Sequence, residues 1–200
     1  MNYLNEGKSI ALVSDAGTPL ISDPGAVLVE AVINAGFRVI PIVGASAVIG
    51  LLSAIPREDE DFKFIGFLPR VKNQILEIVS KNKNENLIFY ESPNRLIETL
   101  EIIADEYPNK KVAIGRELTK KFEEIKVGNI LEIIEYFKNN TLKGEIAGML
   151  YKDEIQQEID LDEKIKKLKS LNLKDKEISS ILAGLYDVNK NQVYKRCLDI

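Results

Sequence analysis

The chain has 200 residues, of which 45% are hydrophobic and 29% are charged, and its formal net charge is −4. It contains no histidine and a single cysteine, Cys197, which excludes a Ser-His-Asp or Cys-His nucleophile, a histidine-ligated metal and an internal disulfide. No apolar run reaches the roughly 18 residues that a membrane-spanning helix needs. We therefore expect a cytoplasmic protein with no membrane segment and no metal, which does not bind nucleic acid by bulk charge alone.

The first part of the chain is predicted to alternate between strand and helix. Short apolar runs are typical of strands buried in a parallel sheet, and the segment between them has apolar residues at helical spacing. The expected strand, helix, strand and short helix lie at 9–13, 27–35, 37–43 and 47–54.

A charged stretch with a proline, 55–61, then predicts a domain boundary. Beyond it the alternation resumes, with strands expected at 62–67, 87–90, 111–114, 124–127 and 145–151. Helices are expected at 72–80, 93–107 and 131–137. The pattern predicts an α/β protein with two α/β domains, residues 1–56 and 57–152.

The last part of the chain, 153–200, has a different texture, because it is rich in lysine and has Leu and Ile at helical spacing. Ile178, Ile181, Leu182 and Leu185 fall on one helical face, and a second short helix is expected after Asn189. Two helices and a tight turn predict a tail that resembles a helix-turn-helix. This tail binds RNA phosphates, or it serves dimer contacts or core packing as alternative roles.

Three loops follow predicted strand ends, at 14–19, 44–47 and 91–93. Ligands of open α/β sheets bind at the carboxyl ends of strands. In the first loop Gly17 allows a ligand to approach the backbone, and Thr18 offers a hydroxyl group beside it. The loops suit a nucleoside-like ligand, although the same residue types also form ordinary turns.

The string ALVSDAGTPLISDPG at 11–25 resembles the signature of the tetrapyrrole methylase superfamily. It is most similar to the branch of ribosomal RNA small-subunit (16S rRNA) cytidine-2′-O-methyltransferases. Further matching strings follow in the order of the family: GASA at 44–47, FIGFLPR at 64–70, LIFYESPNRL at 87–96, GRELTKKFEE at 115–124 and KGE at 143–145. The resemblance implies S-adenosylmethionine in a cleft between two α/β domains, and 2′-O-methylation of a cytidine in the decoding region of the small ribosomal subunit.

The resemblance also implies which residues contact the cofactor. They come from the first two loops and from two strand ends of the second domain: Ala16, Gly17, Thr18, Ile21, Ser46, Ala47, Tyr90 and Leu118. One departure is Val43-Gly44, which replaces the usual Pro-Gly of the family. Family members also open with a strand and a GTPIGNL-like loop, so we expect an N-terminally truncated or shortened relative whose first domain is incomplete.

A ribose 2′-hydroxyl is a poor nucleophile, so a base or a polarising cation is expected to assist it. In the absence of histidine, the candidates are charged residues near strand ends of the matched motifs: first Glu91 and Arg116, then Glu117, Lys143 and Glu145. Each of them is alternatively a member of an ordinary ion pair. For the phosphates of 16S rRNA the candidates are Arg70, Lys72, Lys120 and Lys121, which alternatively form a solvated surface.

The resemblance further implies a homodimer, in addition to the small ribosomal subunit as a partner. Two other functions stay open: methylation of tetrapyrroles, meaning porphyrin or corrin precursors, and non-catalytic RNA binding by a degenerate relative. The FYESPNRL and RELTKKFEE strings and the helical tail favour RNA methylation. The missing opening strands favour the non-catalytic alternative.

Overall fold

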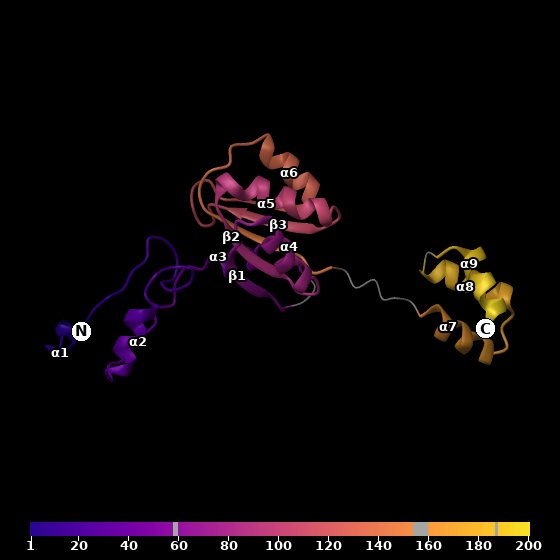
Figure 1. Cartoon of the computed structure of the whole chain (residues 1–200), viewed down its shortest axis with the longest axis horizontal. Helices are drawn as coiled ribbons and strands as arrows, with labels where there is room; N and C mark the ends of the chain where they lie inside the picture. The colour runs from indigo at the N-terminus through magenta and orange to yellow at the C-terminus, as the bar shows by residue number, and fades with distance from the viewer. Residues whose placement is uncertain (58–59, 154–159, 187) are drawn as a thin grey trace. The chain divides into compact units, whose positions relative to one another are not determined.

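The computed structural model describes residues 1–57, 60–153, 160–186 and 188–200. Its contacts group the chain into two compact units, Met1–Asp153 and Glu154–Ile200, whose elements are labelled in Figure 1. The division into 1–56, 57–152 and 153–200 therefore stays a prediction, since residues on both sides of position 57 belong to the first unit.

The first unit is built on a five-stranded sheet in the order β1-β2-β5-β3-β4. The strands are β1 (Lys63–Phe67), β2 (Leu87–Glu91), β3 (Lys111–Arg116), β4 (Glu124–Asn129) and β5 (Ile146–Leu150). Strands β1 and β2 pair in parallel, and the other neighbours pair antiparallel. The sequence prediction of these strands is confirmed, and the α/β class with it.

Three helices cover one face of this sheet: α4 (Lys72–Lys81), α5 (Pro93–Glu106) and α6 (Ile130–Lys138). Helices α5 and α6 pack side by side, as Figure 1 shows. Leu87 and Phe89 of β2 are buried against them together with Leu96 and Leu100 of α5. Pro93 occupies the first turn of α5, where its missing N–H removes no helical hydrogen bond.

The opposite face of the sheet is covered by α3 (Ala47–Ser53). Leu51 of this helix packs with Ile88 of β2, Ala113 of β3 and Met149 of β5. Because successive side chains of a strand point to opposite faces, a strand covered on both faces has a continuous apolar sequence. This explains why the central strands were readable as the runs LIFY and IAGML.

Residues 1–46 contain two helices, α1 (Asn2–Asn5) and α2 (Ala26–Asn34), and no strand. The predicted helix at 27–35 is confirmed, whereas the predicted strands at 9–13 and 37–43 are wrong. Their side chains are largely exposed, with 81% for Val13 and 98% for Val43. A strand is stabilised by ladder hydrogen bonds to a neighbour, and neither segment pairs with an edge of the sheet.

The second unit has three helices among its described residues: α7 (Leu161–Ser170), α8 (Asp175–Tyr186) and α9 (Lys190–Asp199). The sequence prediction recognised only the last two. The second unit has a small hydrophobic core of its own, which contains Ile165, Ile178, Leu182, Val193 and Cys197. The buried apolar face of α8 is narrower than the predicted one, because Ile181 and Leu185 remain 38% and 68% exposed.

Candidate functional site

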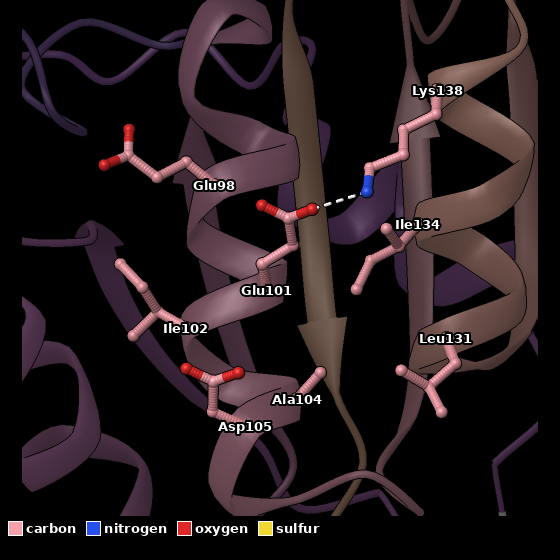
Figure 2. A pocket seen from close by; sticks show the side chains of 8 residues that line it. All are labelled: Glu98, Glu101, Ile102, Ala104, Asp105, Leu131, Ile134 and Lys138. Atoms are coloured by element: carbon pink, nitrogen blue, oxygen red, sulfur yellow. Dashed lines mark ion pairs between the residues drawn. The ribbon is translucent and has the colours of Figure 1, made fainter.

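An open groove of about 490 Å³ lies between α5 and α6. Figure 2 shows an ion pair across it, in which Lys138 Nζ lies 2.6 Å from Glu101 Oε1. The lining residues are Glu98, Glu101, Ile102, Ala104, Asp105, Leu131, Ile134 and Lys138. None of them belongs to a motif that predicts a ligand, and the predicted loops lie elsewhere in the sequence.

The two small-residue loops of the N-terminal segment are joined by one hydrogen bond. The Thr18 hydroxyl donates to the carbonyl of Ala45 at 3.0 Å, which links positions 27 residues apart. Gly17 beside it has a φ of +74°, a left-handed conformation that glycine adopts without strain. The first loop is therefore shaped so that its backbone and the Thr18 side chain meet the second loop.

The second loop leads directly into α3. Ser46 is the N-cap of this helix, and its hydroxyl accepts a hydrogen bond from the Ile49 N–H at 3.4 Å. Ala47 follows as the first helical residue and is exposed. Ser46 thus has a structural role as a helix cap. This cap fixes the start of α3 and with it the preceding Ala45 carbonyl, which Thr18 contacts.

Tyr90 at the end of β2 lies on the α3 side of the sheet. Its ring packs against the core that contains Val48 of α3 and makes an edge contact with Phe64 at 4.9 Å between centroids. Burial raises the pKa of Tyr90, and the negative charges of Asp23 and Glu145 raise it further. Tyr90 therefore stays uncharged at neutral pH.

Leu118 completes this region from the loop after β3. It packs against the core beneath α3, and a Cβ placed on Gly115 would lie 3.1 Å from its side chain and 2.9 Å from that of Leu51. Gly115 is thus needed for the close approach of Leu118 and α3. The structure brings Thr18, Ser46, Ala47, Tyr90 and Leu118 around the start of α3; Ala16, Gly17 and Ile21 lie exposed on the first loop.

Glu91, the first candidate base, lies on the other face of the sheet from Tyr90, because it is the next residue of the same strand. Its side chain is completely buried, and the Thr99 hydroxyl of α5 donates to Oε2 at 2.9 Å. Arg95 of the same helix forms an ion pair with it at 3.2 Å. The structure therefore separates Glu91 from the residues around α3.

Arg116 likewise lies on the α6 side. Its guanidinium group is 3.2 Å from Glu124 Oε2 and donates to the Lys143 carbonyl at 3.3 Å. Glu124 in turn accepts a hydrogen bond from the Tyr136 hydroxyl of α6. The Arg116 side chain is 16% exposed, and it forms a structural ion pair with Glu124. Its contacts join β3, β4 and the KGE segment.

Glu117, Lys120 and Glu145 form a network at the ends of β3 and β5. Glu117 accepts the Glu145 N–H at 2.9 Å and pairs with Lys120 at 3.0 Å, and Lys120 also pairs with Glu145 at 3.0 Å. The hydrogen bond from Glu145 and the bond from Lys120 hold the pKa of Glu117 below its usual value. A Cβ on Gly144 would overlap the Glu117 carboxyl group, which explains the glycine of the KGE motif.

The candidate RNA contacts differ in their availability. Lys72 is paired with Asp105 at 2.8 Å, and Lys120 belongs to the network just described. Arg70 is exposed after β1, and Lys121 is exposed with its ammonium group 5.6 Å from the Phe122 ring. Arg70 and Lys121 are therefore the freer of the four candidates.

Several residues of the site were not predicted from the sequence. Arg95 and Thr99 surround Glu91, and Asp23 is close enough to Tyr90 for its charge to act on the hydroxyl group. Glu91 ends β2 and Arg95 lies in the first turn of α5, so opposite charges on either side of this short strand–helix junction were a readable signal for an ion pair. Across the described residues, no group of three or more Cys, Asp and Glu could hold a metal ion, and no helix is long and apolar enough to cross a membrane.

The fold is that of known methyltransferases. The crystal structure of the methyltransferase CobJ matches with a TM-score of 0.55 and 18% identity, over 76% of this chain and 68% of that chain. The cobalt precorrin-4 methyltransferase CbiF matches with a TM-score of 0.54 and 13% identity, over 75% and 66%. At these identities the likeness defines the class of fold and nothing finer.

Sequence comparison identifies the family. The family model of tetrapyrrole (corrin/porphyrin) methylases matches residues 1–134, and this chain belongs to that family. It is similar to the ribosomal RNA small subunit methyltransferase I of Halalkalibacterium halodurans, with 48% identity over 146 residues, 72% of this chain and 50% of the relative. The protein of the same name from Vibrio cholerae is 40% identical over 206 residues, 98% of this chain and 70% of the relative. The chain thus spans half to about seven tenths of the length of these relatives.

Proposed function

We propose that this chain carries out, or forms the larger part of a protein that carries out, S-adenosylmethionine-dependent 2′-O-methylation of a cytidine in 16S rRNA, in the decoding region of the small ribosomal subunit. The observation that carries the proposal is the meeting of the predicted contact segments at α3, through the Thr18–Ala45 hydrogen bond and the packing of Tyr90 and Leu118 against Val48 and Leu51 of this helix. The names of the relatives at 40–48% identity support the substrate class.

The residues around α3 fit an adenosyl ligand. Gly17 and Ala47 are exposed and have no bulky side chain, so a ring can approach the backbone of both loops. Thr18 supplies a hydroxyl group, and the half-buried Tyr90 supplies an aromatic wall. The bound cofactor would supply an activated methyl group on a sulfonium, so the task of this chain is to bind, orient and exclude water.

The 2′-hydroxyl of the ribose must lose its proton during transfer. Among the five sequence candidates, Glu145 is the carboxylate whose charge acts on Tyr90, and its side chain is 64% exposed. Glu91 and Arg116 lie on the opposite face of the sheet. We therefore place Glu145 before Glu91 as the proposed proton acceptor, with Lys120 holding it in place at 3.0 Å.

The proposal includes the partners and the location that the family resemblance implies. Arg70 and Lys121, both exposed, are the proposed phosphate contacts for rRNA. A cytoplasmic homodimer completes the proposal. Sedimentation of the purified chain tests the dimer directly, because a mass near twice 22.5 kDa is expected and a monomer at all concentrations would contradict it.

The cofactor site is tested by calorimetry with S-adenosylhomocysteine. We expect binding by the chain and loss of binding in Thr18→Arg, because the long cationic side chain would fill the space between the two loops. Thr141→Arg, an exposed position in the loop after α6, is the matched control and should bind as the original chain does. Binding that survives in Thr18→Arg would refute this placement of the site.

The substrate is tested by transfer of a labelled methyl group to small ribosomal subunits, and separately to porphyrin and corrin precursors. The full-length Halalkalibacterium halodurans relative serves as the positive control. Label in the ribose of a 16S rRNA cytidine is the expected result. Label in the tetrapyrroles alone would replace the proposal by tetrapyrrole methylation, and cofactor binding without transfer to either would favour a non-catalytic RNA-binding role.

A further inference from the structure

A buried ion pair at the end of β2 connects two loops. Glu91 is fully buried, Arg95 is 24% exposed, and Arg95 Nη2 lies 3.2 Å from Glu91 Oε2. The other carboxylate oxygen, Oε1, accepts the N–H of Ser92 at 2.7 Å, and Oε2 also accepts the Thr99 hydroxyl. Both oxygens of Glu91 are therefore occupied by hydrogen-bond donors.

The guanidinium group of Arg95 also reaches the loop after β1. Nη2 donates to the carbonyl of Pro69 at 2.7 Å, and Nη1 and Nη2 lie 3.4 and 3.3 Å from the carbonyl of Leu68. Leu68 itself is buried with 2% exposure. A planar group with several fixed donors thus ties the β1 loop to the start of α5.

The end of β1 is shaped by a bulge just before this loop. Gly66 has a φ of +70°, and the register with β2 shifts between Phe64 and Phe67. Bulges of this kind re-aim the side chains that follow. The ring of Phe67 consequently lies 5.7 Å from that of Tyr90 and remains 57% exposed, and a Cβ on Gly66 would lie 3.4 Å from the Ser22 hydroxyl of the first loop.

We infer that Glu91 and Arg95 are positioning residues that hold loop 67–70 as an RNA-binding wall beside Tyr90, where an unpaired base stacks on Phe67 and a phosphate meets Arg70. An exposed aromatic ring and a cation three residues apart supply the two contacts by which proteins bind single-stranded RNA. The inference rests on the proposed function for its substrate, and it gives Glu91 a role in place of proton transfer.

The first test measures the loop without any turnover. Arg95→Met keeps an unbranched side chain that can pack like the stem of Arg95 and removes its donors, so the amides of Leu68 and Arg70 should exchange with solvent at least about tenfold faster. Arg95→Lys, which retains the charge but not the planar fork, should lie between Arg95→Met and the original chain. Glu98→Gln, an exposed position on the same helix, is the control. Unchanged exchange in Arg95→Met would overturn the positioning role.

The second test measures RNA binding, with an unpaired oligoribonucleotide of the small-subunit decoding region as the probe. Phe67→Ala changes an exposed side chain and leaves the Arg95 contacts intact. We expect its affinity for the oligonucleotide to fall about tenfold and its affinity for S-adenosylhomocysteine to remain within twofold. An unchanged RNA affinity would overturn the stacking role, whether or not the chain transfers methyl groups.

The third test separates positioning from proton transfer by Glu91→Gln, assayed for methyl transfer. A positioning role predicts a higher KM for the RNA substrate, a kcat within about tenfold of the original, and an unchanged pH profile. A base predicts a loss of kcat of about 10²–10⁴ and the disappearance of the acidic limb of the profile. The second pattern would overturn the inference for Glu91. If the original chain transfers no methyl group while the full-length relative does, the proposal that this chain alone carries out the transfer fails, and the exchange and binding tests still decide the role of loop 67–70.

Discussion

Two apolar segments of this chain have similar sequences and different structures. The segment LIFYE forms β2, in which Ile88 and Phe89 are completely buried, whereas FRVIPIV forms no strand and leaves Ile42 and Val43 80% and 98% exposed. Strand β2 has a neighbour on each side and helices on both faces. The comparison teaches that an apolar run indicates a tendency to be buried, and that a strand forms only where partners supply the ladder hydrogen bonds.

The largest expected effect is on stability. Phe89→Ala empties a site between the sheet and α5, so the free energy of unfolding should fall by about 3–5 kcal/mol. Val43→Ala removes a side chain that is already in water and should change it by no more than about 0.5 kcal/mol. Urea unfolding followed by circular dichroism measures both. A cost of several kcal/mol for Val43→Ala would mean that this segment is buried in solution, and would abolish the contrast.

Limited digestion with trypsin tests the same contrast along the backbone. Arg38 is exposed in a segment without ladder hydrogen bonds, whereas Arg116 ends β3 and is held by Glu124. Cleavage requires local opening of the chain. The free energy of this opening is close to zero around Arg38 and approaches the free energy of global unfolding around Arg116. We expect cleavage after Arg38 to be at least roughly a hundredfold faster, measured by mass spectrometry of the fragments. Equal rates would contradict the difference between the two regions.

Much of the sheet and its helices was predictable, because local patterns and tertiary partners agree there. Several local patterns are each compatible with a single type of element: the buried runs of β2 and β5, the proline at the start of α5 and the amphipathic pattern of α4. At 37–43 the local pattern was equally strong, but pairing depends on partners that a single segment does not encode. Local periodicity therefore predicted elements, and it did not predict whether each element finds a neighbour.

The sequence motifs selected two loops and Tyr90 as a candidate cofactor site, which stays a prediction, and they gave less guidance on the charged residues. Thr18 and Tyr90 were singled out by motif, and the structure links both to the region around α3. Glu91 was chosen because it ends a strand, but the strand alternation that turns Tyr90 toward α3 turns Glu91 toward α5. The face of a sheet on which a side chain lies depends on the register of the strand, and a motif string does not state that register.

The hydrogen bond that ties the two N-terminal loops together offers a smaller effect. Thr18→Val keeps the shape of the side chain and removes the donor to Ala45, a change of about 1 kcal/mol. We expect S-adenosylhomocysteine to bind roughly fivefold more weakly in calorimetry, with the urea midpoint of the sheet unchanged. Thr18→Ser retains the hydroxyl group and should bind as the original chain does. Equal affinity of Thr18→Val and Thr18→Ser would show that this bond does not organise the loops.

The smallest effect concerns the pH dependence of the network at Glu117. Its pKa is held below the usual 4.5, first by the Glu145 N–H and then by Lys120. Because the pKa is lower in the folded state than in the unfolded state, the stabilisation is present above pH 4.5 and is lost as pH falls through the lowered pKa. Glu117→Gln should therefore be less stable than the original chain at pH 7, and this difference should shrink as the pH falls below 4.5. Urea midpoints at several pH values measure it, with the exposed Glu98→Gln as control. A difference that stays constant with pH would assign the effect to the shape of the left-handed Glu117 turn, at a φ of +50°, instead of its charge.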